Sequence, residues 1–204
     1  MGSFWTKTPV TASNSSPISE SRAWPVLASI HTIVFDFDGV FTDNTVMVDQ
    51  DGVESVRCSR ADGLAIDMLR ASIDMGKLKA EMFILSREAN PVVKARAEKL
   101  KLEYRYNSAD KKGYMDAYLA QRFPRAASAY QGVVFLGNDL NDLELVGAVG
   151  FSVVPEDAHP MVKERASTTL PRRGGDGFVR LFVERLLNVA GMRLESIYEL
   201  VRHR

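Results

Sequence analysis

Short apolar runs alternate with longer stretches of helical periodicity along most of the chain, and this alternation constrains the fold more than any other feature. Residues 31–37 (HTIVFDF), 81–86 (EMFILS) and 132–139 (GVVFLGND) have the β-branched and apolar composition of buried strands. Helical patterns separate and follow them, at residues 62–71, 90–103, 110–122 and 178–191. Strands that alternate with helices predict a Rossmann-like, three-layer α/β/α fold, with a mostly parallel sheet between two helical layers.

Capping signals predict where several helices begin. Asn90 followed by Pro91 is a favourable start, because Asn caps well and Pro is tolerated in the first turn. Asp62 is the expected N-cap of the helix that precedes the strand EMFILS. A short helix in the segment DAHPMVKERA is expected to be interrupted near Pro160.

Residues 45–58 depart from the alternation and predict a β-hairpin insertion. Two short apolar runs flank Asp51-Gly52, a dipeptide typical of tight hairpin turns. The segment is too short to hold a large cap domain, so we expect none.

Composition excludes several classes of protein. With 204 residues, of which 46% are hydrophobic and 25% charged, the chain can form one substantial core. Lys plus Arg number 26 and Asp plus Glu number 26, so no basic field indicates nucleic acid. The single cysteine, Cys58, excludes an intramolecular disulfide and fits a reducing compartment such as the cytoplasm. No apolar run approaches the roughly 20 residues that cross a bilayer, so we expect no membrane partner.

The first 27 residues differ in composition from the rest. They are rich in Ser, Thr and Pro, and they lack the basic and then apolar order of a secretory signal. We expect residues 1–27 to be a flexible leader and residues 28–204 to form one domain, because no repeat or internal linker follows.

Two carboxylates, Asp36 and Asp38, stand one residue apart directly after the first predicted strand, in FDFDGVFTD. On a strand they point to the same face, where like charges repel unless a cation or a proton lies between them. An Asp-Gly turn without further function is the alternative interpretation.

The residues at the ends of the other predicted strands favour a functional site over a simple Asp-Gly turn. In parallel sheets, ligands bind beyond the carboxyl ends of the strands. Polar residues occur at the ends of the other strands and at the start of a helix: Ser86, Lys111, Asn138, Asp139, Asn141 and Asp142. Each has an ordinary structural explanation by itself, but their joint placement predicts a site at one edge of the sheet.

These residue types suit phosphoryl transfer. Carboxylates with a further oxygen ligand bind Mg²⁺, and lysine and hydroxyl groups bind phosphate oxygens. One carboxylate can attack phosphorus to form an aspartyl-phosphate, and a second can protonate the leaving alcohol and deprotonate the attacking water.

From about residue 31 to 190 the chain resembles the haloacid dehalogenase superfamily of phosphatases. More narrowly, it is similar to the branch with 3-deoxy-manno-octulosonate 8-phosphate phosphatase, the nine-carbon sugar-acid phosphatases and the C-terminal domain of some acylneuraminate cytidylyltransferases. The segments that carry the resemblance include FDFDGVFTD, RADGLAI, ILSREANPVVKARAEKL, FLGNDLNDLELVGAVG, PEDAHPMVKERA and RRGGDGFVRLFVERLL.

The resemblance implies a role for each polar residue. Asp36 matches the nucleophile, and Asp38 matches the general acid/base that also offers its backbone carbonyl to Mg²⁺. Ser86 and Lys111 match the phosphate-binding positions. Asn138 stands where the family commonly has a metal-binding Asp, which lowers the expected charge of the metal site.

Further positions are candidates, partly from the resemblance and partly from the residues themselves. Asp142, with Asp139 beside it, is expected to support the metal or the lysine. Candidate substrate contacts are Glu54, Arg57, Arg60 and Arg173. The glycine-rich segment 172–177 is expected either to reach a substrate anion or only to lead into a helix. The segment 70–83 is longer than usual, so we expect a loop near residues 74–79.

The resemblance implies a Mg²⁺-dependent phosphatase of a small sugar acid, either 3-deoxy-octulosonate 8-phosphate or a sialic-acid-like nonulosonate 9-phosphate. It also implies a homotetramer in which the hairpin joins its symmetry mates; a hairpin packed on its own domain is the alternative. The apolar hairpin residues are Val46, Val48, Val53 and Val56.

Two other functions compete with this one. A catalytically weak oligomerisation or regulatory domain would keep the fold, and Asn138 would then mark a decayed site. A phospho-receiver domain also combines Asp, Ser and Lys around Mg²⁺, but it is shorter and lacks the second Asp. We expect no cytidylyltransferase activity, because only a short segment precedes FDFDG.

Overall fold

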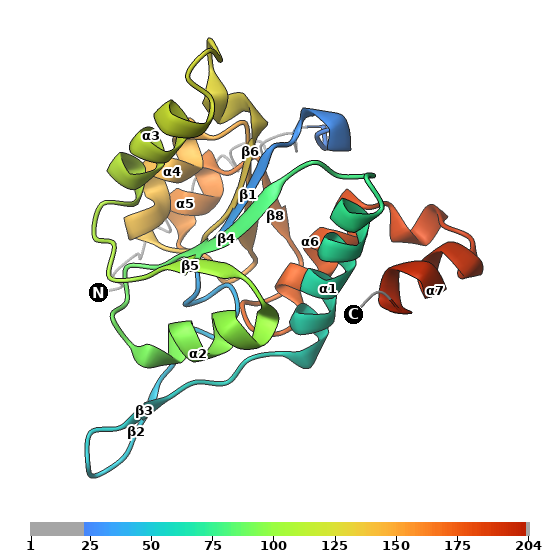
Figure 1. Cartoon of the computed structure of the whole chain (residues 1–204). Helices are drawn as coiled ribbons and strands as arrows, with labels where there is room; N and C mark the ends of the chain where they lie inside the picture. Colours follow the sequence, from blue (N-terminus) through green and yellow to red (C-terminus); the bar gives the residue numbers. More distant parts are fainter. Residues whose placement is uncertain (1–22, 203–204) are drawn as a thin grey trace, which may run out of the picture.

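The computed structural model describes residues 23–202, and every strand pair of its six-stranded sheet is parallel (Figure 1). The strand order is β5-β4-β1-β6-β7-β8. The strands are β1 (Thr32–Phe35), β4 (Glu81–Leu85), β5 (Glu103–Arg105), β6 (Val133–Leu136), β7 (Phe151–Pro155) and β8 (Thr168–Leu170). The predicted fold class is confirmed. Residues 1–22, most of the predicted leader, lie outside the described residues.

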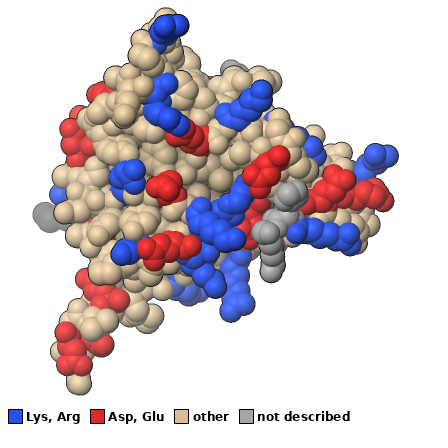
Figure 2. All heavy atoms as spheres, in the orientation of Figure 1, with Lys and Arg blue, Asp and Glu red and all other residues tan. Residues whose placement is uncertain are grey.

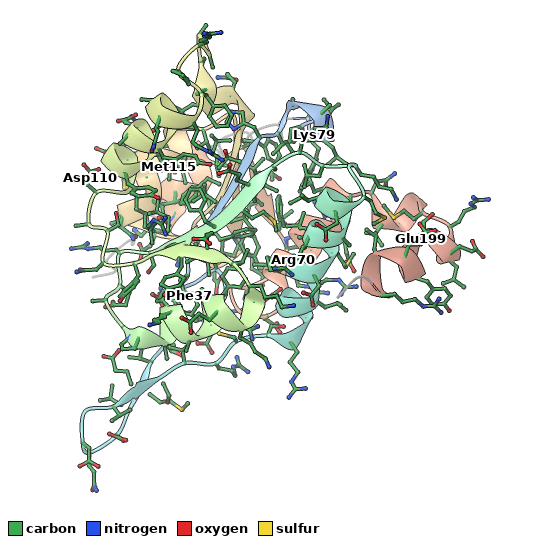
Figure 3. All side chains as sticks on the ribbon, in the orientation of Figure 1. Phe37, Arg70, Lys79, Asp110, Met115 and Glu199 are labelled. Atoms are coloured by element: carbon green, nitrogen blue, oxygen red, sulfur yellow. The ribbon has the colours of Figure 1, made fainter. Side chains whose placement is uncertain are left out.

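Helices cover both faces of the sheet (Figure 1). One face carries α1 (Arg60–Asp74), α2 (Pro91–Leu100), α6 (Phe178–Leu186) and α7 (Leu194–Arg202). The other carries α3 (Lys111–Arg122), α4 (Leu143–Ala148) and α5 (Pro160–Arg165). Short 3-10 turns are η1 (Leu27–Ser29), η2 (Ala129–Gly132), η3 (Leu140–Asp142) and η4 (Val189–Gly191). Each helical layer encloses its own hydrophobic core with the sheet. Phe37, in the core under α1, α2, α6 and α7, and Met115, in the core under α3, α4 and α5, are labelled in Figure 3 on opposite sides of the sheet.

The central strands are buried on both faces. All four residues of β1 and all four of β6 are buried, as expected for parallel strands between two helical layers. The ends of these strands are therefore fixed by packing, which holds the residues that follow them in place.

Two predicted helix boundaries are wrong. The helix α1 begins at Arg60, because Ser59 is its N-cap and accepts a hydrogen bond from the Ala61 N–H. Asp62 lies inside the first turn, where its Oδ1 accepts the Arg180 N–H of α6 at 2.8 Å. Pro160 begins α5 instead of interrupting it, since its missing N–H costs nothing in a first turn.

Local patterns also miss two edge strands. β5 and β8 have three residues each, too few to show a period of two. The loop expected near residues 74–79 occupies residues 75–80, because α1 continues to Asp74.

The predicted hairpin is present, with β2 (Met47–Val48) antiparallel to β3 (Glu54–Ser55). Gly52 in its turn has φ 77°, which glycine adopts without strain. The hairpin projects past the edge at which the parallel strands end, and acidic side chains line it in Figure 2. Val46, Val48 and Val53 are exposed, whereas Val56 packs against the core.

Across residues 23–202, we find no helix with the length and apolar character needed to cross a membrane.

Candidate active site

A buried ammonium lies between two carboxylates where β1, α3 and the turn after β6 meet. Lys111 Nζ is 2.7 Å from Asp36 Oδ1 and 2.6 Å from Asp142 Oδ1. Their side chains are only 2%, 5% and 0% exposed, in that order. Asp36 directly follows β1, and Lys111 is the first residue of α3, whose N-cap Asp110 is labelled in Figure 3. Three distant parts of the chain thus converge on one cluster.

Burial and charge shift the protonation of this cluster. Burial, reinforced by the charge of Asp142, raises the pKa of Asp36 to about 8, although Lys111 opposes the shift. Burial by itself lowers the pKa of Lys111, but Asp36 and Asp142 together raise it. Lys111 therefore stays charged, whereas burial favours the protonated form of Asp36. A second cation beside Asp36 would favour its ionised form.

Asp142 also organises the turn GNDLND. Its Oδ2 accepts the N–H of Asn138 at 2.8 Å, and it forms a reciprocal capping box with Asp139. A Cβ at Gly137 would lie 2.6 Å from Asp142 Oδ2, so a larger residue here would displace that carboxylate. Asp142 thus links the lysine to the turn that carries Asn138.

Asp38 lies in a tight loop between β1 and the hairpin. Thr42 Oγ1 accepts the N–H groups of Gly39 and Asn44, which holds the loop closed. Burial first, and then the charge of Glu88, raise the pKa of Asp38. A raised pKa suits a group that must hold a proton before it donates one.

Gly39 brings this loop against Asn138. Its φ is 72°, and a Cβ there would lie 1.8 Å from the Asn138 amide nitrogen. Only glycine permits this approach, which sets the Asn138 side chain beside the backbone of the Asp38 loop.

A hollow of about 640 Å³ opens in front of the cluster. Its walls include Asp36, Asp38, Asn44, Ser86, Glu88 and Asn138. Ser86 Oγ accepts the N–H of Glu88 at 3.0 Å. Lys111 touches Asp36 without lining the hollow itself. The structure therefore brings together Asp36, Asp38, Ser86, Lys111, Asn138, Asp139 and Asp142, as their positions at strand ends predict.

The candidate substrate residues are not brought to this hollow. Arg57 pairs with Asp43 at 3.0 Å, and Arg60 is exposed at the start of α1. Arg173 pairs with Asp157 at 3.4 Å. Glu54 lines two smaller neighbouring hollows instead. Within one chain, none of these four lines the space in front of Asp36.

Four polar wall residues were absent from the sequence prediction: Asn44, Arg87, Glu88 and Asn107. Arg87 and Glu88 directly follow Ser86 at the end of β4, so the rule that located Ser86 could have found them. Asn44 and Asn107 have positive φ, which no sequence period indicates.

The glycine-rich segment 172–177 leads into α6 and packs on the Asp38 loop. The Gly175 N–H donates to Val40 O at 3.1 Å. A Cβ at Gly174 would lie 2.0 Å from Gly39 O. Of the two predicted roles for this segment, the contacts favour the one that leads into a helix and supports the loop.

The donor set fits a hard divalent cation. Asp36 and Asp142 contact one ammonium and Asp38 lines the same hollow, so acidic side chains outnumber the lysine. No three side chains of the His, Cys, Asp or Glu type within residues 23–202 are grouped so as to hold a metal ion by themselves. A site here therefore needs neutral oxygens as well, such as the Asn138 amide and a backbone carbonyl, which Mg²⁺ accepts.

Comparison with known proteins agrees with this architecture. No protein-family model matches the chain. The 3-deoxy-D-manno-octulosonate 8-phosphate phosphatase KdsC of Escherichia coli K12 is 28% identical over 163 residues, which cover 80% of this chain and 82% of KdsC. A crystal structure assigned to the HAD family hydrolases, from Streptomyces avermitilis, has a TM-score of 0.74 at 35% identity and covers 85% of this chain and 95% of its own. The chain belongs to the HAD family.

This HAD family member also shares its fold with the 3-deoxy-D-manno-octulosonate 8-phosphate phosphatase of Moraxella catarrhalis, whose structure contains magnesium, phosphate and KDO. The TM-score is 0.69 at 21% identity, with 78% of this chain and 87% of that chain covered. The predicted assignment to HAD-type phosphoric monoester hydrolases is confirmed. The similarity to cytidylyltransferase domains stays a prediction, because none of these relatives is one.

Proposed function

We propose that this HAD family member is a Mg²⁺-dependent phosphatase of 3-deoxy-manno-octulosonate 8-phosphate. The observation that carries the proposal is the buried Asp36–Lys111–Asp142 cluster behind a hollow that also contains Asp38 and Ser86. The name of the KdsC relative supplies the substrate. None of the relatives named above is a nonulosonate phosphatase, so the octulosonate ester is the first substrate to test.

Asp36 is the proposed nucleophile. Asp36 lines the hollow, and Lys111 holds its Oδ1 in place. Attack on phosphorus forms an aspartyl-phosphate and breaks the bond to the substrate oxygen. Asp38 donates its proton to that leaving oxygen, then takes a proton from the water that hydrolyses the aspartyl-phosphate. Ser86, whose Oγ is held by the Glu88 N–H, would bind a phosphate oxygen.

Asp36, the Asp38 carbonyl and Asn138 would hold the divalent cation. A bound Mg²⁺ would neutralise phosphate charge and favour the ionised form of Asp36. The acidic side chains that outnumber Lys111 in this site support the metal proposal, whereas the Moraxella structure, at 21% identity, supports the common fold.

The test is phosphate release from 3-deoxy-manno-octulosonate 8-phosphate at pH 7, with Mg²⁺ and with EDTA. We expect turnover only with Mg²⁺. Asp36→Asn should abolish turnover, and Asp38→Asn should lower kcat about 10²- to 10⁴-fold, because Asn keeps the shape but transfers no proton. Circular dichroism of both variants serves as the control for folding. An Asp36→Asn variant that keeps most of the wild-type rate would contradict the mechanism.

A further inference from the structure

Glu88 lines three adjoining hollows. The inner hollow, in front of Asp36, measures about 640 Å³, the middle one about 170 Å³ and the outer one about 580 Å³. Glu88 is on the wall of each. Asp38 and Asn44 line both the inner and the middle hollow. Glu54 and Asn90 line both the middle and the outer hollow. The shared walls make one groove, which runs from Asp36 outwards between the hairpin and α2.

All the charged wall residues of the outer two hollows are acidic: Asp38, Glu54 and Glu88. Glu88 and Glu54 both act through their charge on Asp38, and both raise its pKa. Glu54 Oε2 accepts the Asn90 Nδ2–H at 2.5 Å, and Glu88 Oε1 accepts the Ala89 N–H at 2.9 Å. These bonds hold the two carboxylates in place beside the proposed acid/base.

Cations are confined to the inner end of the groove. Arg87 lines the inner hollow, next to Ser86. Neither of the outer two hollows has a Lys or Arg among its wall residues in the described part of the chain. A carboxylate of a substrate placed beyond Asp38 would thus meet two like charges without a partner.

We propose that Glu88, together with Glu54, selects phosphate esters whose leaving group carries neutral hydroxyls beside the ester oxygen, and rejects those that carry a carboxylate there. Ionised carboxylates accept hydrogen bonds from hydroxyl groups, and they repel other carboxylates. Specificity would arise as much from this repulsion as from attraction. The inference rests on the proposed phosphatase function.

The proposed octulosonate substrate agrees with this rule. Its name places the phosphate on carbon 8, at the opposite end from the carboxylate of the sugar acid. The carbon next to the ester therefore carries a hydroxyl, and the carboxylate stands at the far end of the carbon chain.

Two three-carbon phosphate esters test the inference. Glycerol 3-phosphate has a hydroxymethyl group at the position where 3-phosphoglycerate has a carboxylate, and the two are otherwise the same. For the wild-type enzyme we expect kcat/KM to favour glycerol 3-phosphate by about tenfold or more. Glu88→Gln, which removes the charge and keeps the shape, should reduce this ratio about fivefold, mainly through faster 3-phosphoglycerate hydrolysis. Glu54→Gln should act in the same direction. Glu98→Gln on the outer face of α2 is the matched control and should leave the ratio unchanged.

The outcomes separate this inference from the function on which it rests. An unchanged ratio in Glu88→Gln and Glu54→Gln would overturn the selection rule. So would a wild-type enzyme that hydrolyses p-nitrophenyl phosphate but not glycerol 3-phosphate. If the wild-type enzyme releases phosphate from no ester at all, the proposed function itself fails.

Discussion

Of the candidate site residues, Asn138 differs most from what the resemblance implies, because an amide stands where a metal-binding Asp is expected. Its backbone N–H is bound to Asp142, and its side chain lies against Gly39, so it is held firmly but brings no charge. Ligand charge is one of the main determinants of affinity for hard cations. This residue therefore offers a direct test of the proposed metal site.

Asn138→Asp should tighten Mg²⁺ binding. One added carboxylate charge in a partly buried site contributes on the order of 1–3 kcal/mol, after repulsion from Asp36 and Asp142 is subtracted. The midpoint of a Mg²⁺ titration of activity, or of calorimetric binding, should fall about 5- to 150-fold. The maximal rate need not rise, because the extra charge also opposes phosphate binding. A midpoint equal to that of the wild type would show that Asn138 does not contact the metal.

His31, at the opposite end of β1, predicts a dependence of stability on pH. Its ring lies 3.8 Å from Phe123, Nε2 donates to Ala129 O at 2.9 Å, and Nδ1 accepts from Thr32 Oγ1 at 2.8 Å. Burial lowers the pKa of His31. Below about pH 6.5 the unfolded chain binds a proton that the folded chain refuses, so the free energy of unfolding falls as the pH falls.

The measurement is the urea midpoint of wild type and His31→Gln between pH 5 and pH 7.5. The stability of the wild type should decline more steeply towards pH 5 than that of the variant. Parallel curves would mean that His31 titrates alike in both states. Burial raises the pKa of Asp62 to about 6, so Asp62 also titrates in this range. Because both proteins contain Asp62, it does not contribute to the difference between their stability curves.

At the scale of elements, the contact between the segment 172–177 and the Asp38 loop is the most sensitive. The two backbones approach so closely that a Cβ at Gly174 would lie 2.0 Å from Gly39 O. Gly174→Ala must therefore move the loop that carries Asp38. Because displacements near 1 Å cost about 10²-fold in rate, we expect kcat/KM to fall on the order of 100-fold, with a loss of roughly 1–3 kcal/mol in stability.

Gly147→Ala is the matched control for this prediction. Gly147 lies in α4, and a Cβ there meets no atom within 4 Å. Alanine should stabilise the helix by about 0.5–1 kcal/mol and leave activity unchanged. Equal activity of Gly174→Ala and Gly147→Ala would refute the supporting role of the segment.

Local sequence signals predict the presence of helices and strands better than the residues at which they begin and end. Asn90 and Pro91 start α2 as expected, because both act within a single turn. At α1, Ser59 and Asp62 are both good caps, and the choice depends on α6, whose Arg180 N–H occupies Asp62. A contact between residues so far apart has no local signature.

The candidate site shows the same division. The rule that ligands bind beyond the carboxyl ends of strands locates Asp36, Ser86 and Asn138. It does not show that Lys111 bonds to Asp36, nor that Arg57 turns towards Asp43, because side-chain direction depends on tertiary packing.

At the scale of the whole molecule, the hairpin predicts an assembly. Val46, Val48 and Val53 are 52%, 59% and 61% exposed on a ribbon that projects from the domain. Exposed apolar residues in such a group indicate an interaction surface. We expect a homotetramer, in which hairpins of neighbouring chains cover one another.

Sedimentation at micromolar concentration is the measurement. Wild type should sediment as a tetramer, and the double substitution Val46→Lys and Val48→Lys should dissociate it. Lys77→Glu, in the loop after α1, tests whether any surface charge change has the same effect. A wild-type monomer would exclude the assembly.

The position of β1 at the centre of the sheet has a consequence for biosynthesis. Thr32 pairs in register with Glu81 on one side and with Val133 on the other, so its partners are translated long after it. While the ribosome is still making the middle of the chain, the strand that leads to Asp36 keeps one edge without hydrogen bonds. Such an edge invites pairing with another nascent chain. Synthesis that pauses before residue 133 should therefore make this protein depend on chaperones, and Asp36, whose N–H donates to Leu136 O, would be fixed in place only after β6 has been made.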